Sequence, residues 1–143
     1  MKFKFLIILI LSLFITNFAY SHNHYPITRN SVSDILKGKV LYNQNCASCH
    51  KANLAGATDW KGLDKDGHRK APPLNGTGHT WHHDDKTLHS IIKYGLVKLV
   101  EGYEGKMMGF EENLSDKDID SVLAYIKSYW PKDKYEHQIG ISK

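Results

Sequence analysis

The stretch "NQNCASCHKA", residues 43–52, constrains this chain more than any other. It holds the only two cysteines, Cys46 and Cys49, and His50 follows the second directly. A Cys-x-x-Cys pair suits three chemistries, which are a redox dithiol, a zinc site and covalent haem. The dithiol interpretation requires a βαβ context, whereas the flanking residues here have helical and loop-like patterns.

A zinc site is the second interpretation of the same pair. His79, together with His82 or His83, would complete the ligands in a loop further along the chain. The gap between the cysteine pair and the histidine pair is about twice that of a zinc finger. A His-rich metal-binding protein therefore stays an alternative, and the spacing does not favour it.

Covalent haem is the third interpretation, because Cys-x-x-Cys-His is the c-type haem attachment sequence. Haem carries two vinyl groups on neighbouring pyrrole rings, and each can form a thioether with a thiol. Two intervening residues in a helical turn set the two sulfur atoms to reach both vinyl groups. The adjacent His50 then projects over the porphyrin and offers a ring nitrogen to the iron.

The pair Met107–Met108 fits the same interpretation. The only other methionine is Met1, and the pair lies in a glycine-rich loop without helix or strand periodicity. Methionine thioether commonly fills the second axial position of haem iron in electron-carrying cytochromes, where it raises the reduction potential. One of these two residues is therefore the candidate for the sixth iron ligand.

Apolar spacing predicts an all-α protein. Helices are expected over 33–45, 85–94 and 115–130, each with the i, i+3, i+4 pattern or a capping sequence at its start. Gly95 is placed as the stop of the second helix, and Ser115 with Asp118 forms a capping-box pattern at the start of the third. Long loops over 51–84 and 95–114 separate them, and loops of that length need something to organise them. Few residues alternate as strands do, so we expect almost no sheet.

These features together resemble a class I monohaem cytochrome c of the bacterial periplasmic kind. The resemblance covers residues 34–130 and rests on four pieces in order: "GKVLYNQNCASCH", "APPLNG", "MMGF" and "LSDKDIDSVLAYIKSYW". Ala71 stands where the family has a glycine, and Met108 stands where it has a proline. The resemblance implies three to four helices wrapped round one covalently bound haem c, with long loops.

The resemblance also implies roles for single residues. Met107 becomes the sixth ligand, because Phe110 then falls where the family's Met-x-x-Phe pattern places it. Pro72 aligns with a proline whose carbonyl oxygen accepts a hydrogen bond from the proximal histidine, here His50. Trp81 is a candidate donor to a haem propionate.

The resemblance has one further implication, which concerns the packing of the helices. Gly38 and Tyr42 on the first helix are expected to cross Tyr125 on the last helix, because a glycine there allows a close approach.

The N-terminal residues predict the compartment. Residues 1–21 carry Lys2 and Lys4, an apolar run and the small-x-small ending Ala19-Tyr20-Ser21, which together are typical of a secretory signal peptide. We expect cleavage after about Ser21 and a periplasmic protein, which is held at the membrane only if this segment stays uncleaved.

The remaining residues divide by composition. A flexible leader is expected over 22–33, the cytochrome c domain over 34–131 and a C-terminal tail over 132–143. Without the two signal-peptide lysines the chain has 17 basic and 15 acidic residues. This near balance, and the lack of a basic stripe with interleaved aromatics, gives no case for nucleic acid.

The sequence therefore predicts an electron carrier and not an enzyme. It is expected to be a monomer that meets redox proteins by transient contact at the haem edge. The alternative is a haem-bearing electron-transfer subunit of a periplasmic oxidoreductase complex.

Overall fold

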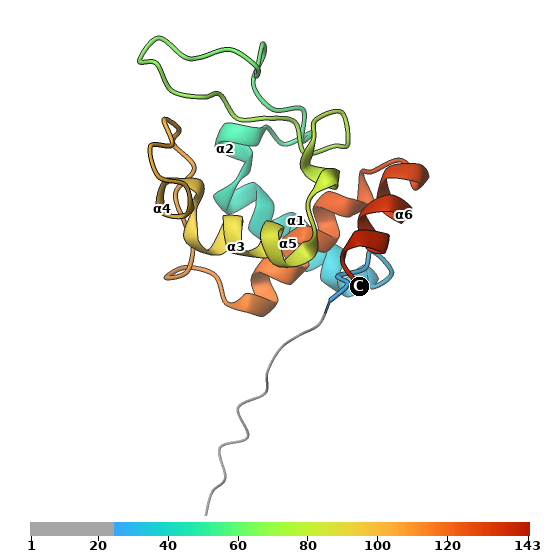
Figure 1. Ribbon diagram of the computed structural model, residues 1–143. Coiled ribbons are helices and arrows are strands. Elements are labelled where there is room, and N and C mark those ends of the chain that lie inside the picture. Colours follow the sequence, from blue (N-terminus) through green and yellow to red (C-terminus); the bar gives the residue numbers. More distant parts are fainter. Residues whose placement is uncertain (1–24) are drawn as a thin grey trace, which may run out of the picture.

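The structure, a computed structural model, describes residues 25–143 and is all-helical over that range (Figure 1). The signal peptide predicted over 1–21 and the start of the predicted leader lie outside the described residues. The elements are α1 (Val32–Asn45), α2 (Ala47–His50), the 3-10 helix η1 (Thr80–His82), α3 (Asp85–Tyr94), α4 (Leu96–Leu99), α5 (Asp116–Ser128) and α6 (Lys132–Ile141).

The all-α prediction is confirmed. Within the described range there are only isolated β-bridges, such as those joining Leu63 to Arg69 and Gly95 to Met108. Four helices have ten or more residues, and α2 and α4 are single turns of four residues each. No helix in this part of the chain has the length and apolar character to cross a membrane.

Side-chain caps fix where the longest helices begin. The Ser31 hydroxyl accepts a hydrogen bond from the Asp34 backbone N–H at 3.2 Å, at the start of α1. Ser115 and Asp118 form a full capping box at the start of α5, as the sequence predicts. Each cap satisfies N–H groups that the first turn of a helix leaves without a partner.

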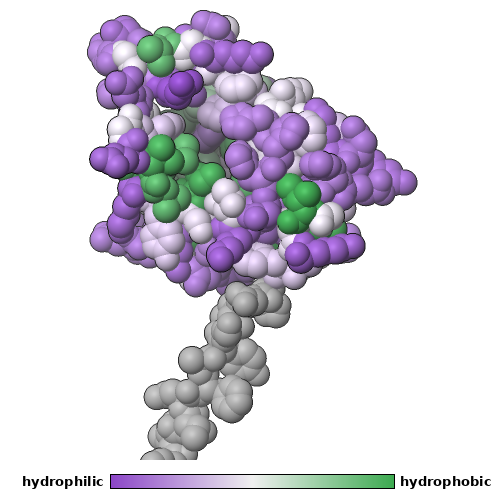
Figure 2. Space-filling model, in the orientation of Figure 1, coloured by the Kyte–Doolittle hydropathy of each residue, from purple (hydrophilic) through white to green (hydrophobic). Residues whose placement is uncertain are grey.

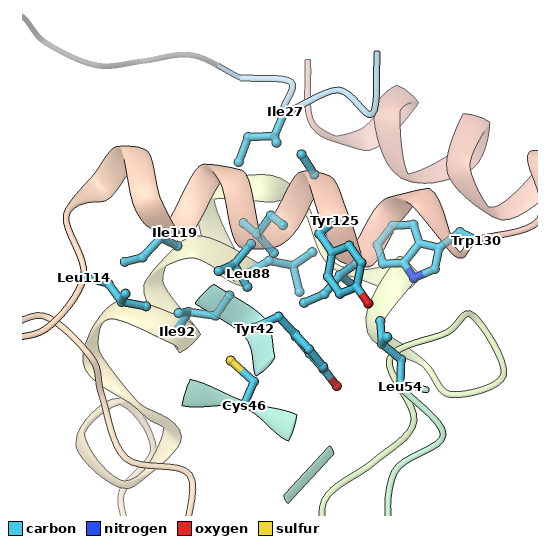
Figure 3. Close-up of a cluster of buried hydrophobic side chains, with 14 residues drawn as sticks. Ile27, Tyr42, Cys46, Leu54, Leu88, Ile92, Leu114, Ile119, Tyr125 and Trp130 are labelled. Carbon is cyan, nitrogen blue, oxygen red and sulfur yellow. The ribbon is translucent and has the colours of Figure 1, made fainter. Parts of the chain in front are cut away.

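Helices α1 and α5 cross at Gly38, and this contact is the centre of the fold. A Cβ atom placed on Gly38 would lie 1.9 Å from the Ser121 carbonyl oxygen and 2.9 Å from the Tyr125 Cβ. The rings of Tyr42 and Tyr125 pack beside this crossing with their centroids 5.4 Å apart (Figure 3). The predicted close crossing of the first and last family helices is therefore confirmed.

The long loop after α2 is held by backbone contacts to buried residues. Leu54 is fully buried, and its carbonyl oxygen accepts a hydrogen bond from the Leu74 N–H at 2.8 Å. The indole N–H of Trp130, just after α5, donates to the Leu74 carbonyl oxygen at 2.8 Å. Both ends of the loop thus attach to the same hydrophobic core (Figure 3).

A buried ion pair joins α3 to α5. Lys127 and Asp85 are both fully buried and pair through the lysine ammonium and the Asp85 carboxylate. The Ile27 N–H donates to that carboxylate at 2.6 Å, the Ile27 carbonyl oxygen accepts from Lys127 at 2.7 Å, and Gln138 donates to Asp85 at 2.8 Å. Burial lowers the pKa of Lys127, and the neighbouring Asp85 opposes that shift.

The two ends of the described chain differ from the prediction. The sequence predicts a flexible leader over 22–33, but Ile27 is buried and the Arg29 guanidinium lies 4.0 Å from the centre of the Tyr135 ring. The sequence also predicts a tail over 132–143, yet most of that segment forms α6. Both ends pack there because they supply hydrogen bonds to the buried pair of Asp85 and Lys127. Ile27 does so at one end of the described chain and Gln138 at the other.

We predict that Gly38→Ala destabilises the haem-bound protein by about 1–3 kcal/mol, because the added methyl group overlaps the Ser121 carbonyl and forces α1 and α5 apart. Urea unfolding measures this change. Gly140→Ala in α6 is the matched control, since a Cβ atom there has no neighbour within 4 Å. The control should be neutral or stabilised by up to about 1 kcal/mol. Equal effects at both glycines would contradict the account of the crossing.

We predict that Lys127→Met costs about 3–5 kcal/mol in the free energy of unfolding, because it leaves the buried Asp85 carboxylate without its partner charge. Adding Asp85→Leu to that variant should recover part of the loss. Chemical denaturation of the parent, the single variant and the double variant measures the three free energies of unfolding. If the free energy of unfolding of Lys127→Met lies within about 1 kcal/mol of the parent value, the buried pair does not hold α3 and α5 together.

Candidate cofactor site

The two cysteines and the histidine of the motif lie in one tight helical turn. The Cys46 N–H donates to the Tyr42 carbonyl oxygen at 2.8 Å, which continues α1, and the His50 N–H donates to the Cys46 carbonyl oxygen at 2.9 Å, which closes α2. Both thiols are free; Cys46 is buried and Cys49 is exposed. Burial, with a smaller contribution from Cys49, raises the pKa of Cys46 to about 11.

His50 is oriented by the carbonyl oxygen of Pro72. The ring Nδ1 lies 2.9 Å from that oxygen, so an Nδ1–H donates to it and Nε2 is the nitrogen that can bind a ligand. Burial lowers the pKa of His50, and the hydrogen bond to Pro72 acts in the opposite direction. The neutral imidazole that results is the form that binds a metal.

Gly56 allows the loop to bring Pro72 to this position. Its φ of +70° lies in the left-handed region, and a Cβ atom there would lie 2.6 Å from the Pro72 carbonyl carbon. The Gly56 N–H also donates to the His50 carbonyl oxygen at 3.0 Å. No local sequence pattern marks Gly56 for this role, because the contact joins residues that are apart in the sequence.

The loop that carries Met107 is packed directly against the end of α3. A Cβ atom on Gly95 would lie 2.4 Å from the Gly109 nitrogen and 2.7 Å from the Met107 carbonyl oxygen, and one on Gly109 would lie 2.5 Å from the Tyr94 carbonyl carbon. The Phe110 N–H donates to the last turn of α3. Two glycines in contact therefore fix the position of this loop, and only Gly95 was predicted, as a helix stop.

The two methionines have different environments. Met107 is partly buried, whereas Met108 has 68% of its surface exposed. The Met107 carbonyl oxygen accepts from the Val97 N–H at 3.5 Å, which places it beside the start of α4. Of the two methionines, Met107 is therefore the less exposed.

An apolar cleft opens between α3 and α4, next to this loop. It encloses about 540 Å³, and Ile91, Leu96, Leu99 and Val100 supply most of its apolar lining. Figure 2 shows apolar surface gathered in the region of α4, beside a hollow in this face of the protein. The cysteines, His50 and Met107 are not among the residues that line it.

Trp81, which stays a predicted donor to a haem propionate, contacts Gly78, His82 and His137 in this structure. Its indole N–H donates to the Gly78 carbonyl oxygen at 3.0 Å. Its ring packs on His82 with centroids 3.6 Å apart and meets His137 of α6 edge-on. The ring thus supports the contact between η1 and α6.

In the histidine-rich loop, residues 79–83, the imidazole side chains make ring-to-ring contacts. His79 stacks on Trp60 with centroids 5.9 Å apart, and His83 meets His79 edge-on. Burial lowers the pKa of His79, and the charges of His83 and His82 lower it further. Over residues 25–143, no three or more His, Cys, Asp or Glu side chains are placed to hold a metal ion. This geometry gives no support to the zinc interpretation.

Comparison with known proteins gives the family. Residues 35–130 match the model of the cytochrome c family. Because that match spans more than half of the chain, this protein belongs to the cytochrome c family.

Individual relatives agree with this assignment. The chain is 29% identical over 106 residues to cytochrome c-555 of Prosthecochloris aestuarii, which covers 65% of this chain and 85% of that protein. It is 28% identical over 94 residues to cytochrome c6 of a Synechocystis species, covering 66% and 64%. It is also 33% identical over 93 residues to the cbb3-type cytochrome c oxidase subunit FixP of Azorhizobium caulinodans, covering 64% of this chain and 28% of that subunit.

Membership of this family implies a covalently bound haem c, and the residues present fit that group. Cys46 and Cys49 are free thiols one helical turn apart, which suits two thioethers to one porphyrin. His50 lies in the same turn with one ring nitrogen already bonded. The protein is therefore an electron-transfer haem protein with the all-α cytochrome c fold.

We predict that replacing both cysteines, as Cys46→Ala with Cys49→Ala, reduces haem-bearing protein to background and leaves little folded chain. The long loops hold few apolar side chains, so they depend on the cofactor for packing. Haem staining of a denaturing gel and an immunoblot for total protein measure the two effects. Ser48→Ala in the same turn is the control and should retain both. Normal levels of cooperatively folding, haem-free variant would contradict the prediction.

Proposed function

We propose that this chain is an exported carrier of single electrons whose haem iron is bound by His50 and Met107. When bound, the haem iron supplies one-electron redox chemistry between its ferric and ferrous states. If His50 and Met107 both hold the iron, no position on it would be left for a substrate, so we expect electron transfer and no catalytic reaction.

The observation that carries the proposal is the contrast between the two methionines. Met107 is partly buried in a loop held against α3 and α4, whereas the Met108 side chain faces solvent. A ligand must be held at a fixed position, because a thioether is a weak donor that other groups readily replace. The glycine contact at Gly95 and Gly109 supplies that restraint.

On the histidine side, Pro72 is the proposed orienting residue. An acceptor on Nδ1 fixes both the tautomer and the plane of a ligating imidazole, and it raises the basicity of the ligand. The separation of 2.9 Å between His50 Nδ1 and the Pro72 carbonyl oxygen supports this role. Trp81 stays a predicted propionate donor, and its N–H donates to Gly78 in this structure.

The location and partners follow from the same proposal. Residues 1–21 have the pattern of a signal peptide, and c-type haem is attached after export, so the proposed location is the periplasm. The carrier acts as a monomer that meets redox proteins transiently at the haem edge. Its nearly balanced charge implies little long-range electrostatic steering.

A second candidate function is that of a haem subunit in an oxidase complex. The observation in its favour is the match to FixP, together with 32% identity over 92 residues to the cbb3-type oxidase subunit CcoP of an Azospirillum species. The chain spans only 28% and 27% of these two subunits, against 85% of cytochrome c-555. Co-purification with other subunits under native conditions would favour this candidate over a free carrier.

We predict that Met107→Ala abolishes the weak charge-transfer band of Fe(III)–sulfur coordination near the red end of the visible spectrum and lowers the reduction potential. The reason is the loss of the thioether, which favours the ferrous state. Met108→Ala is the matched control and should keep the band. Absorption spectra of the ferric proteins and a redox titration give the two readings.

If Met108→Ala loses the band and Met107→Ala keeps it, Met108 is the ligand. A band that persists in both single variants would show that each methionine can replace the other. A parent protein with no such band would exclude methionine and direct attention to the histidines of residues 79–83.

A further inference from the structure

Two long loops that belong to opposite sides of the proposed iron site meet at one place. The Arg69 N–H, in the loop that also carries Pro72, donates to the Glu104 carbonyl oxygen at 2.9 Å. Beside it, the Lys106 ammonium lies 2.8 Å from the Asp64 Oδ2 and 3.6 Å from the Asp66 Oδ2. One backbone hydrogen bond and two ion pairs of Lys106, the shorter with Asp64, therefore join the two loops.

Asp64 is held ready for this contact by its own turn. Its Oδ1 accepts from the Asp66 N–H at 3.0 Å and from the His68 N–H at 2.9 Å. Its backbone N–H donates to the His68 carbonyl oxygen at 2.8 Å. Because one carboxylate oxygen is used within the turn, the other oxygen is fixed in direction toward Lys106 and loses little freedom on pairing.

The position of Lys106 in the sequence makes the contact relevant to the ligand, because Lys106 directly precedes Met107. The residues that follow Met107 are held at Gly95 and Gly109 by backbone contact. Met108 stands where the resembling family has a proline, so the loop lacks one fixed φ angle. On the N-terminal side of Met107, the position of the loop therefore depends on contacts made by the preceding residues.

We propose that Asp64 and Lys106 form a cross-loop tie that positions Met107 on the iron. The inference rests on the proposed function, since it needs Met107 as the ligand. Asp64 and Lys106 are positioning residues in this account, and neither contacts the reacting atoms. The tie slows the opening of the loop that must precede loss of the thioether.

The test measures that opening directly. Imidazole added to the ferric haem-bound protein replaces the methionine only after the thioether has left, so the rate reaches a plateau at high imidazole concentration. Asp64→Asn keeps an oxygen for the turn while removing the charge that pairs with Lys106. The plateau rate should rise about two- to fivefold, the range expected for an exposed ion pair.

Three further proteins make the result specific. Lys106→Gln removes the ion pairs with both Asp64 and Asp66, so it should raise the plateau rate at least as much as Asp64→Asn. The double variant should give no more than Lys106→Gln alone, because Lys106 is the shared partner. Glu136→Gln, which breaks an exposed ion pair with Lys132 within α6, is the control and should leave the rate unchanged. Raising the salt concentration should bring the parent rate toward that of the variants.

Unchanged plateau rates in both single variants, or additive effects in the double variant, would overturn the tie while the charge-transfer band still supported Met107. A parent protein without that band would instead overturn the ligand assignment and the tie with it.

Discussion

The contact between α1 and α5 at Gly38 sets the position of both halves of the site. Helix α1 runs directly into the Cys46–His50 turn, and the methionine loop runs directly into α5 (Figure 1). Because a Cβ atom at Gly38 would overlap the Ser121 carbonyl, the two helix backbones touch without an intervening side chain. Tyr42 and Tyr125 then fill the space beside the crossing.

The two sides of the site are built in different ways. On the histidine side, the turn, the Pro72 carbonyl and the buried Leu54 form a compact set of backbone hydrogen bonds. On the methionine side, the loop rests on glycine contacts with the end of α3 and on an exposed ion pair at Lys106. Backbone contacts in a close-packed region resist opening more strongly than exposed charges do, so the methionine is the ligand expected to leave first.

The sequence predicted those features that depend on neighbouring residues. The Cys46–His50 turn, the capping box at Ser115 and the helix stop at Gly95 are local patterns, and the structure contains all three. The close crossing at Gly38 came from resemblance to a family and not from any local signal.

Features that depend on distant residues were missed. Nothing in the sequence around Lys127 or Asp85 indicates that they pair, because they are 42 positions apart and each belongs to an ordinary amphipathic helix. The leader and the tail were predicted from composition, which carries no sign that Ile27 and Gln138 bond to this pair. The hydrogen bond from Trp81 to Gly78 was missed for a related reason, because Gly78 lies in a turn whose shape no pattern specifies.

Proton NMR of the ferrous protein can decide whether one haem iron is held between His50 and Met107. The ring current of the porphyrin shifts the methyl group of an axial methionine far upfield, to negative chemical shift. The account predicts one such three-proton resonance, with correlations that assign it to Met107 and not to Met108. A ferrous spectrum without an upfield methyl resonance, or with one that belongs to Met108, would contradict it.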